Sequence, residues 1–197
     1  YPVDPSAVPI GDHWTKTDQG WSHPLHSTLL PRSASAEHHI LAGITSRNEL
    51  LIVNLAASGY LGIEGGDATA IMRSWLMQIL STTPAAQIAV DDPALAIPGS
   101  PRLTLITDPA AAAGATVLFS TAHTRGPSGA AITVSSQAVS ASDVVLCNGP
   151  ATGIYLANRY WPMWRRMELA ESRWASLAAT LSPPTANTGE ATATSKA

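Results

Sequence analysis

The chain has 197 residues, only 13% of them charged, and a formal net charge of −3. This length suits one domain with tails, and the charge gives no global electrostatic footprint for nucleic acid. Cys147 is the only cysteine, so an intrachain disulfide and a cysteine-based metal cluster are excluded. No stretch approaches the ~20 apolar residues of a membrane span, and the N-terminus lacks the pattern of a signal peptide. Because it begins with Tyr1, we expect a fragment or a processed product.

Composition divides the chain into three parts. Residues 1–37, rich in proline and without a sustained period, are predicted to be an irregular N-terminal arm or linker. Residues 38–181 are predicted to be a single α/β domain. Residues 182–197 have no apolar content to bury and are predicted to be a disordered tail.

The first half of the domain reads as strands followed by a helix. His39–Ile44 and Glu49–Leu55 predict a hairpin around the polar turn at residues 45–48, and Tyr60–Ile63 predicts a third strand. A helix follows, with Asp67 as its N-cap and Pro84 marking its end. Its apolar face is expected to be buried and consists of Ile71, Met72, Trp75, Leu76, Ile79 and Leu80.

The second half alternates short strands with polar turns. A short helix is predicted over Pro109–Ala113, and a last helix over Met163–Leu181, whose apolar line includes Trp164, Met167, Trp174 and Leu177. Further strands are predicted at Gln87–Val90, Leu103–Thr107, Val117–Thr121, Ala131–Ser135 and Val144–Cys147. The expected fold class is α/β: a layered, mostly parallel or mixed sheet with a strand–glycine turn–helix unit and a C-terminal helix packed on the sheet.

The turn between the third strand and the helix is the candidate site. A strand, a glycine-rich turn and a helix form the frame in which many α/β proteins hold phosphate. The candidate cofactor-binding residues are Gly62, Gly65, Gly66 and Asp67. The phosphate-loop lysine and hydroxyl are missing, no lysine occurs between Lys16 and Lys196, and the acidic side chains of the turn would repel phosphate. The alternative is a strand-to-helix turn that needs glycine for its backbone.

Residues 38–92, HHILAGITSRNELLIVNLAASGYLGIEGGDATAIMRSWLMQILSTTPAAQIAVDD, carry a resemblance. This segment resembles the nucleotide-binding core of FtsK-like DNA translocases and the related type VII secretion ATPases. The resemblance implies a strand, a phosphate loop, a helix and a strand ending in a magnesium-binding acidic residue, which Asp91 or Asp92 would match. Residues 38–150 also resemble a domain of large multidomain actinobacterial proteins that combine membrane helices, peptidoglycan-binding modules and a transcriptional-activator domain. Together they imply a degenerate nucleotide-binding fold used for regulation or assembly.

Other groups suggest chemistry less specifically. His23 with His26, and His38 with His39, could ligate a metal, but no acidic partner stands at a recognisable offset. Ser120, His123 and Asp108 or Asp143 could form a hydrolase triad, but no nucleophile-elbow motif is present. Cys147 follows an apolar strand and is typical of a small buried side chain. We therefore predict no catalytic residues and no metal site.

Arginines and tryptophans gather near the C-terminus, where a docking surface competes with a helix that simply packs on the sheet. These residues are Arg159, Arg165, Arg166 and Arg173, with Trp161, Trp164 and Trp174. The packed helix is favoured because the large apolar side chains demand burial.

The function predicted from the sequence is a non-catalytic regulatory or protein-interaction domain within a larger bacterial protein. The alternatives are an ATPase-like domain with a non-standard phosphate site, using Arg73 or Arg125 as its cation, and a small hydrolase. The expected partners are another protein or neighbouring domains, with no cofactor and no direct nucleic acid. The expected location is cytoplasmic, with membrane association possible only through segments outside this chain or through the C-terminal helix.

Overall fold

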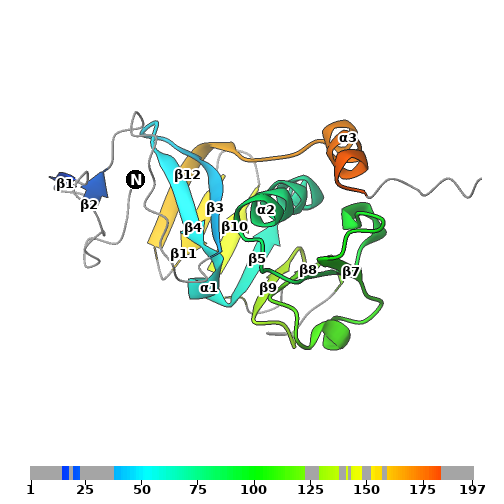
Figure 1. Cartoon of the computed structure of the whole chain (residues 1–197). Coiled ribbons are helices and arrows are strands. Elements are labelled where there is room, and N and C mark those ends of the chain that lie inside the picture. Colours follow the sequence, from blue (N-terminus) through cyan, green and yellow to red (C-terminus); the bar gives the residue numbers. More distant parts are fainter. Residues whose placement is uncertain are drawn as a thin grey trace, which may run out of the picture.

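A computed structural model of the chain describes residues 15–17, 20–22, 38–122, 129–137, 141, 143–147, 152–156 and 159–182. In the described residues, two short strands, β1 (Thr15–Thr17) and β2 (Gly20–Ser22), pair antiparallel within the arm that was predicted to be irregular. All other strands form one ten-stranded sheet (Figure 1). The strands of this sheet are β3 (His39–Thr45), β4 (Leu50–Asn54), β5 (Tyr60–Glu64), β6 (Ile88–Val90), β7 (Leu103–Leu105), β8 (Val117–Ser120), β9 (Ile132–Ser135), β10 (Asp143–Leu146), β11 (Gly153–Leu156) and β12 (Arg159–Arg166).

The sheet has two halves of different construction. Its order is β4-β3-β12-β11-β10-β5-β9-β8-β6-β7. The six strands from β10 to β7 are parallel, whereas β4, β3, β12 and β11 pair antiparallel. The predicted layered α/β fold with a mixed sheet is confirmed.

Strand β5 lies where the chain reverses its direction of travel across the sheet. From β5 the chain crosses to β6, towards one edge, while from β9 it crosses back over β5 to β10. The neighbours β5 and β9 therefore send their connections in opposite directions. In open α/β sheets such a switch point opens a crevice at the carboxyl ends of the strands, where ligands bind.

Helix α2 (Ala68–Thr82) covers one face of the sheet, as the apolar pattern predicted. All six residues of its predicted apolar face are buried, and Trp75 is only 1% exposed. They join the inward residues of the parallel strands, such as Ile63, Phe119 and Val134, in one core cluster. Asp67 is the N-cap of α2, and the helix ends at Thr82, shortly before Pro84. Both predicted boundary signals are therefore confirmed.

A smaller apolar cluster lies apart from this core. Ala89 and Leu118, which stand beside each other on β6 and β8, are buried with Ala112 and Ala130. Ala112 belongs to η2 (Pro109–Ala112), a short 3-10 helix where a helix was predicted. A second 3-10 helix, η1 (Pro93–Leu95), buries Leu95 in the main core. Small side chains such as Ala112 let η2 pack closely against β8.

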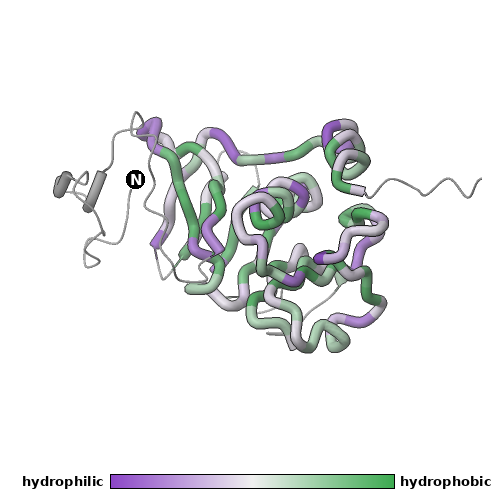
Figure 2. Tube along the Cα trace, viewed as in Figure 1, coloured by the Kyte–Doolittle hydropathy of each residue, from purple (hydrophilic) through white to green (hydrophobic). Residues whose placement is uncertain are grey.

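The predicted hairpin is present as β3 and β4. Its polar turn contains Asn48 at φ 63°, a left-handed conformation that asparagine tolerates, and Figure 2 shows hydrophilic residues at this turn and hydrophobic ones along the strands. The register shifts between Leu41 and Gly43. There the Gln78 side chain of α2 accepts from the Leu41 N–H at 2.7 Å and donates to the Leu41 C=O at 3.1 Å. β12 pairs with β3 only from Gly43 to Thr45. The Gln78 side chain thus satisfies the Leu41 backbone groups, which lie beyond that pairing.

The helix predicted over Met163–Leu181 is wrong in its first part. Residues 159–166 form strand β12, between β11 and β3, and helix α3 begins only at Glu171 and ends at Leu181. Strand β11 was not predicted at all. Aromatic residues suit a pleated surface, and pairing with the neighbouring β11 and with the distant β3 decides the conformation of this segment.

Pro162 lies inside β12 without breaking the sheet. Its C=O accepts a hydrogen bond from the Ser46 N–H at 3.1 Å, and pairing of β12 with β3 begins only at the next residue, Met163. The missing proline N–H therefore falls opposite the hairpin turn, where no ladder bond is lost.

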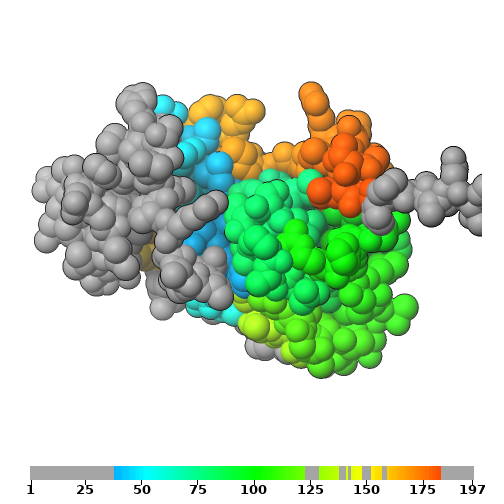
Figure 3. Space-filling view, in the orientation of Figure 1, coloured from blue at the N-terminus to red at the C-terminus, as the bar shows by residue number. Residues whose placement is uncertain are grey.

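Helix α3 packs against the rest of the domain over a narrow line. Trp174 and Ala178 are buried in the main core cluster, whereas Leu177 and Leu181 are exposed. The segment before the helix is fixed by a hydrogen bond from the Leu169 N–H to the Ala70 C=O at 2.9 Å. Figure 3 shows α3, in orange and red, raised on the surface beside the green part of the chain. Trp164, expected on the same apolar face, is 59% exposed on β12 instead.

Candidate functional site

The glycine turn follows β5 at the carboxyl edge of the parallel strands, but Gly62 is not part of it. Gly62 lies within β5, opposite Val144 and Ser135 of the neighbouring strands. The turn itself uses Gly65 at φ 77° and Gly66 at φ 52°, which L-residues rarely adopt. A Cβ on Gly66 would lie 2.9 Å from the Cys147 Cβ. Glycine is therefore required there for backbone conformation and for close packing.

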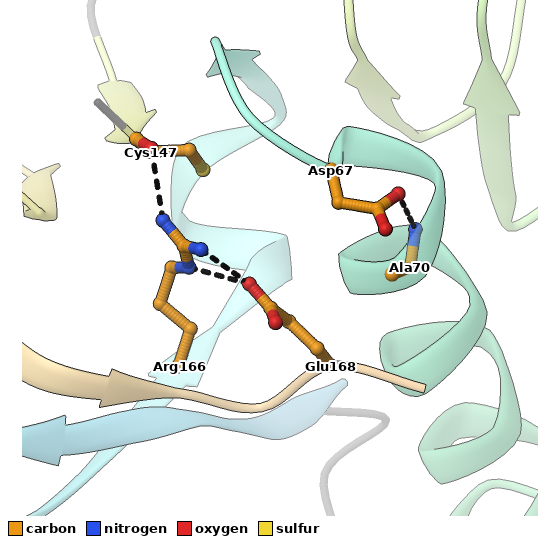
Figure 4. Close-up of polar contacts among 5 residues, drawn as sticks. All are labelled: Asp67, Ala70, Cys147, Arg166 and Glu168. Atoms are coloured by element: carbon orange, nitrogen blue, oxygen red, sulfur yellow. Dashed lines mark hydrogen bonds and ion pairs between the residues drawn. The ribbon is translucent and has the colours of Figure 1, made fainter. Parts of the chain in front are cut away.

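Asp67 caps helix α2 with its own carboxylate. Its Oδ1 accepts a hydrogen bond from the Ala70 N–H at 3.2 Å, and the capped end is drawn in Figure 4. The first-turn amides of a helix are the groups that hold phosphate in a nucleotide-binding frame. In this chain the side-chain anion already occupies part of that position.

Arg166 brings a cation to the same edge of the sheet, and sequence reasoning missed its position. Its Nη1 donates to the Cys147 C=O at 3.0 Å (Figure 4). Cys147 directly follows β10, donates its own N–H to the Glu64 C=O at 2.9 Å and packs against Gly66. No local signal could place Arg166 here, because its position depends on β12 being a strand rather than a helix.

Glu168 neutralises that cation. Arg166 Nε donates to Glu168 Oε1 at 2.6 Å, and Nη2 forms an ion pair with the same oxygen at 2.6 Å. Both side chains line an open hollow of about 380 Å³, whose lining also includes Thr152, Trp164, Arg165 and Met167 and no residue of the glycine turn. Through its bond to the Cys147 C=O, Arg166 links the end of β12 to the end of β10. Because Glu168 pairs with it, Arg166 is not a free cation directed at the turn.

Of the two arginines expected as substitute cations, the structure describes only Arg73, which does not serve the turn. Arg73 is buried, and its Nε donates to the Ala94 C=O at 3.3 Å, which ties α2 to η1. Arg73 was not among the residues of this helix predicted to be buried, so its burial is a new finding. Arg125 lies outside the described residues.

Asp91 follows β6, and its carboxylate is bonded to the end of β8. It accepts hydrogen bonds from the Ser120 hydroxyl, from the Thr121 N–H at 2.7 Å and from the Ala122 N–H at 3.2 Å. Asp92 caps η1 by accepting from the Ala94 N–H at 2.8 Å. β8 and β9 lie between β6 and β5, so both carboxylates serve local structure that two intervening strands separate from the glycine turn.

The residues of the possible hydrolase are not assembled by the described part of the chain. Ser120 is fully buried at the carboxyl end of β8 and bonds to Asp91. Asp108 caps η2 by accepting from the Ala110 N–H, and Asp143 begins β10, at the opposite end of the parallel strands. His123 lies outside the described residues.

Burial shifts the pKa values of Cys147 and His38 away from their ordinary values. Burial raises the pKa of the Cys147 thiol, and the Arg166 guanidinium only partly opposes this, so the thiol is protonated at neutral pH. Burial lowers the pKa of His38, and the neighbouring His39 adds to the effect. His23 and His26 lie outside the described residues. Among those described, no three His, Cys, Asp or Glu side chains gather as a metal site would require.

In comparisons with known proteins, no family model, curated protein or solved structure matches the chain. The resemblance to FtsK-like cores therefore stays a prediction. In the described residues, every helix is too short or too polar to cross a membrane.

Proposed function

We propose that residues 38–181 form a non-catalytic regulatory or protein-interaction domain of a larger, actinobacterial-type protein, with a degenerate nucleotide-binding frame. The observation that carries this proposal is the capping contact between the Asp67 carboxylate and the Ala70 N–H. An anion fixed at the first turn of α2 repels phosphate and competes for the amides that would bind it.

The elements around this contact support the proposal that the frame is a degenerate nucleotide-binding site. A strand, a glycine turn and a 15-residue helix lie at the switch point in the parallel half of the sheet, where phosphate sites are built in α/β proteins. Yet the turn has no phosphate-binding lysine, and the loss of such a cation costs several kcal/mol of transition-state stabilisation. Arg166, which contacts Cys147 beside the turn, is paired with Glu168.

A second candidate function is nucleotide binding with Arg166 as the substitute cation. The contact of Arg166 with Cys147, against which Gly66 packs, favours it. In that case a ligand phosphate would displace Glu168 from the guanidinium. Arginine is suited to this exchange because its planar fork binds carboxylate and phosphate alike.

Calorimetric titration of the chain with ATP and Mg²⁺ tests both functions. The proposed domain gives no saturable heat up to millimolar nucleotide, and neither does the Glu168→Gln variant. Binding that appears or strengthens at least tenfold in Glu168→Gln would favour the second candidate. Micromolar binding by the unaltered chain would overturn the proposal outright.

A further inference from the structure

Strand β4 is one outer strand of the ten-stranded sheet, and its own residues carry none of the side chains that usually protect an edge. Its five residues, LLIVN, include no charge and no proline. Proteins commonly guard such edges with lysine, proline or a bulge directed at the partner, because an open edge pairs with another strand. The opposite edge, β7, has only three residues and follows Pro101 closely.

Hydrogen bonds with β3 fix which backbone groups of β4 point outward. The Thr45 N–H donates to Glu49 and the Leu55 N–H donates to His38, so residues 49, 51, 53 and 55 face β3. Leu50 and Ile52 consequently direct their N–H and C=O groups to the open side. Asn54 directs its N–H there, while its C=O serves the first turn of α1 (Leu55–Ser58). In the part of the chain that the structure describes, no hydrogen bond reaches these outward groups of β4.

We propose that two copies of this chain pair antiparallel through β4, about a two-fold axis at Ile52. In this register Ile52 faces its own copy and Leu50 faces Asn54 of the other chain. The outward groups then match: the Ile52 pair exchanges two hydrogen bonds, and each Leu50 C=O accepts one from the opposite Asn54 N–H. An isologous contact of this kind closes on itself and joins two ten-stranded sheets into one.

The side chains agree with the backbone register. Leu51 lies opposite Val53, and Leu50 and Ile52, both half-buried, cover each other across the axis. Cross-strand aliphatic pairs stabilise antiparallel sheets, and no like charges meet along the five residues. Glu49, the nearest charge, falls opposite Leu55, where α1 turns the chain away from the edge.

The inferred dimer gives the proposed interaction domain a partner, and only its biological role rests on the proposed function. Experiments can refute the dimer and the proposed function independently. A monomeric chain that does not bind ATP would refute the dimer and agree with the proposed function, whereas a dimeric chain that binds ATP would do the reverse.

Disulfide trapping tests the register. Ile52→Cys is made in the full chain with Cys147→Ser, and the protein is oxidised mildly at micromolar concentration. Residues in a hydrogen-bonded antiparallel pair have Cα atoms about 5.5 Å apart, within the range a disulfide spans. We expect most of the chain to run as a dimer on a non-reducing gel and as a monomer after reduction.

Two matched variants separate this register from chance collision. Leu50→Cys should trap at least tenfold more slowly, because its two copies stand about 14 Å apart along the strands, whereas Leu50→Cys with Asn54→Cys should trap as readily as Ile52→Cys. Thr104→Cys on β7 measures the background. Equal rates for Ile52→Cys and Thr104→Cys, or no trapping at position 52 in protein whose circular dichroism matches the parent, would overturn the proposal.

Discussion

The parallel and antiparallel halves of the sheet obtain their stability differently. In the parallel half, β5, β8 and β9 turn large apolar side chains towards α2, and short-range patterns identify both strands and helix. In the antiparallel half, β12 exposes Trp164 and holds its place through pairing with β11 and β3. The comparison shows that a local amphipathic pattern identifies the parallel half, whereas the place of β12 in the other half depends on its pairing with β3, which lies far earlier in the chain.

The largest effect should come from the helix that covers the parallel half. Trp75→Ala removes a side chain that is 1% exposed in the core, so we expect a loss of about 3–5 kcal/mol in the free energy of unfolding. Urea denaturation measures it, with Leu177→Ala on the exposed side of α3 as the control. A loss below about 1 kcal/mol would show that α2 is not the centre of the core.

The two tryptophans that one helix was expected to carry provide the sharpest test of the antiparallel half. Trp174→Ala should cost about 3 kcal/mol, because Trp174 is buried at 5% exposure. Trp164→Ala should change stability by no more than about 0.5 kcal/mol, as for other exposed positions. Equal losses in urea denaturation would restore the single helix and remove β12 from the sheet.

Asp91 and Asp92 are neighbours with different structural roles: Asp91 accepts hydrogen bonds from the end of β8, whereas Asp92 caps η1. Asp91→Ala leaves the Ser120 hydroxyl and two amides of the β8 end without their acceptor, so we expect a loss of about 2–3 kcal/mol. Asp92→Ala removes one capping bond and should cost about 1 kcal/mol. Thermal unfolding of the two variants, measured side by side, would contradict this account if Asp92→Ala were the more damaging.

The smallest effect concerns His38, whose Nδ1 is buried without a hydrogen-bond partner among the described residues. Burial lowers its pKa below the ordinary 6.5, so the unfolded chain binds more protons than the folded one as pH falls through 6.5. We expect the free energy of unfolding to decrease below about pH 6.5, and His38→Gln to flatten that slope. The exposed His39 is the control, and an unchanged slope in His38→Gln would refute the assignment.

Much of the parallel half follows from the sequence, since Asp67, Pro84 and the apolar face around Trp75 are local signals with a fixed period. The segment after Pro162 does not, because a run of aromatic and basic residues fits a helix and a strand equally well. The candidate site divides in the same way. The sequence identifies Gly65, Gly66 and Asp67, but Arg166 reaches Cys147 only once β12 has paired with β11 and β3.

Amide resonances of the glycine turn test the central claim most directly. The ¹⁵N-labelled chain is titrated with ATP and Mg²⁺ to several millimolar while the Gly65, Gly66 and Ala70 N–H signals are followed. Because the Asp67 carboxylate caps α2 and Arg166 is paired with Glu168, we predict no saturable shift at these amides. Saturable shifts of all three, with the rest of the spectrum unchanged, would show that the turn still binds phosphate and would contradict the account.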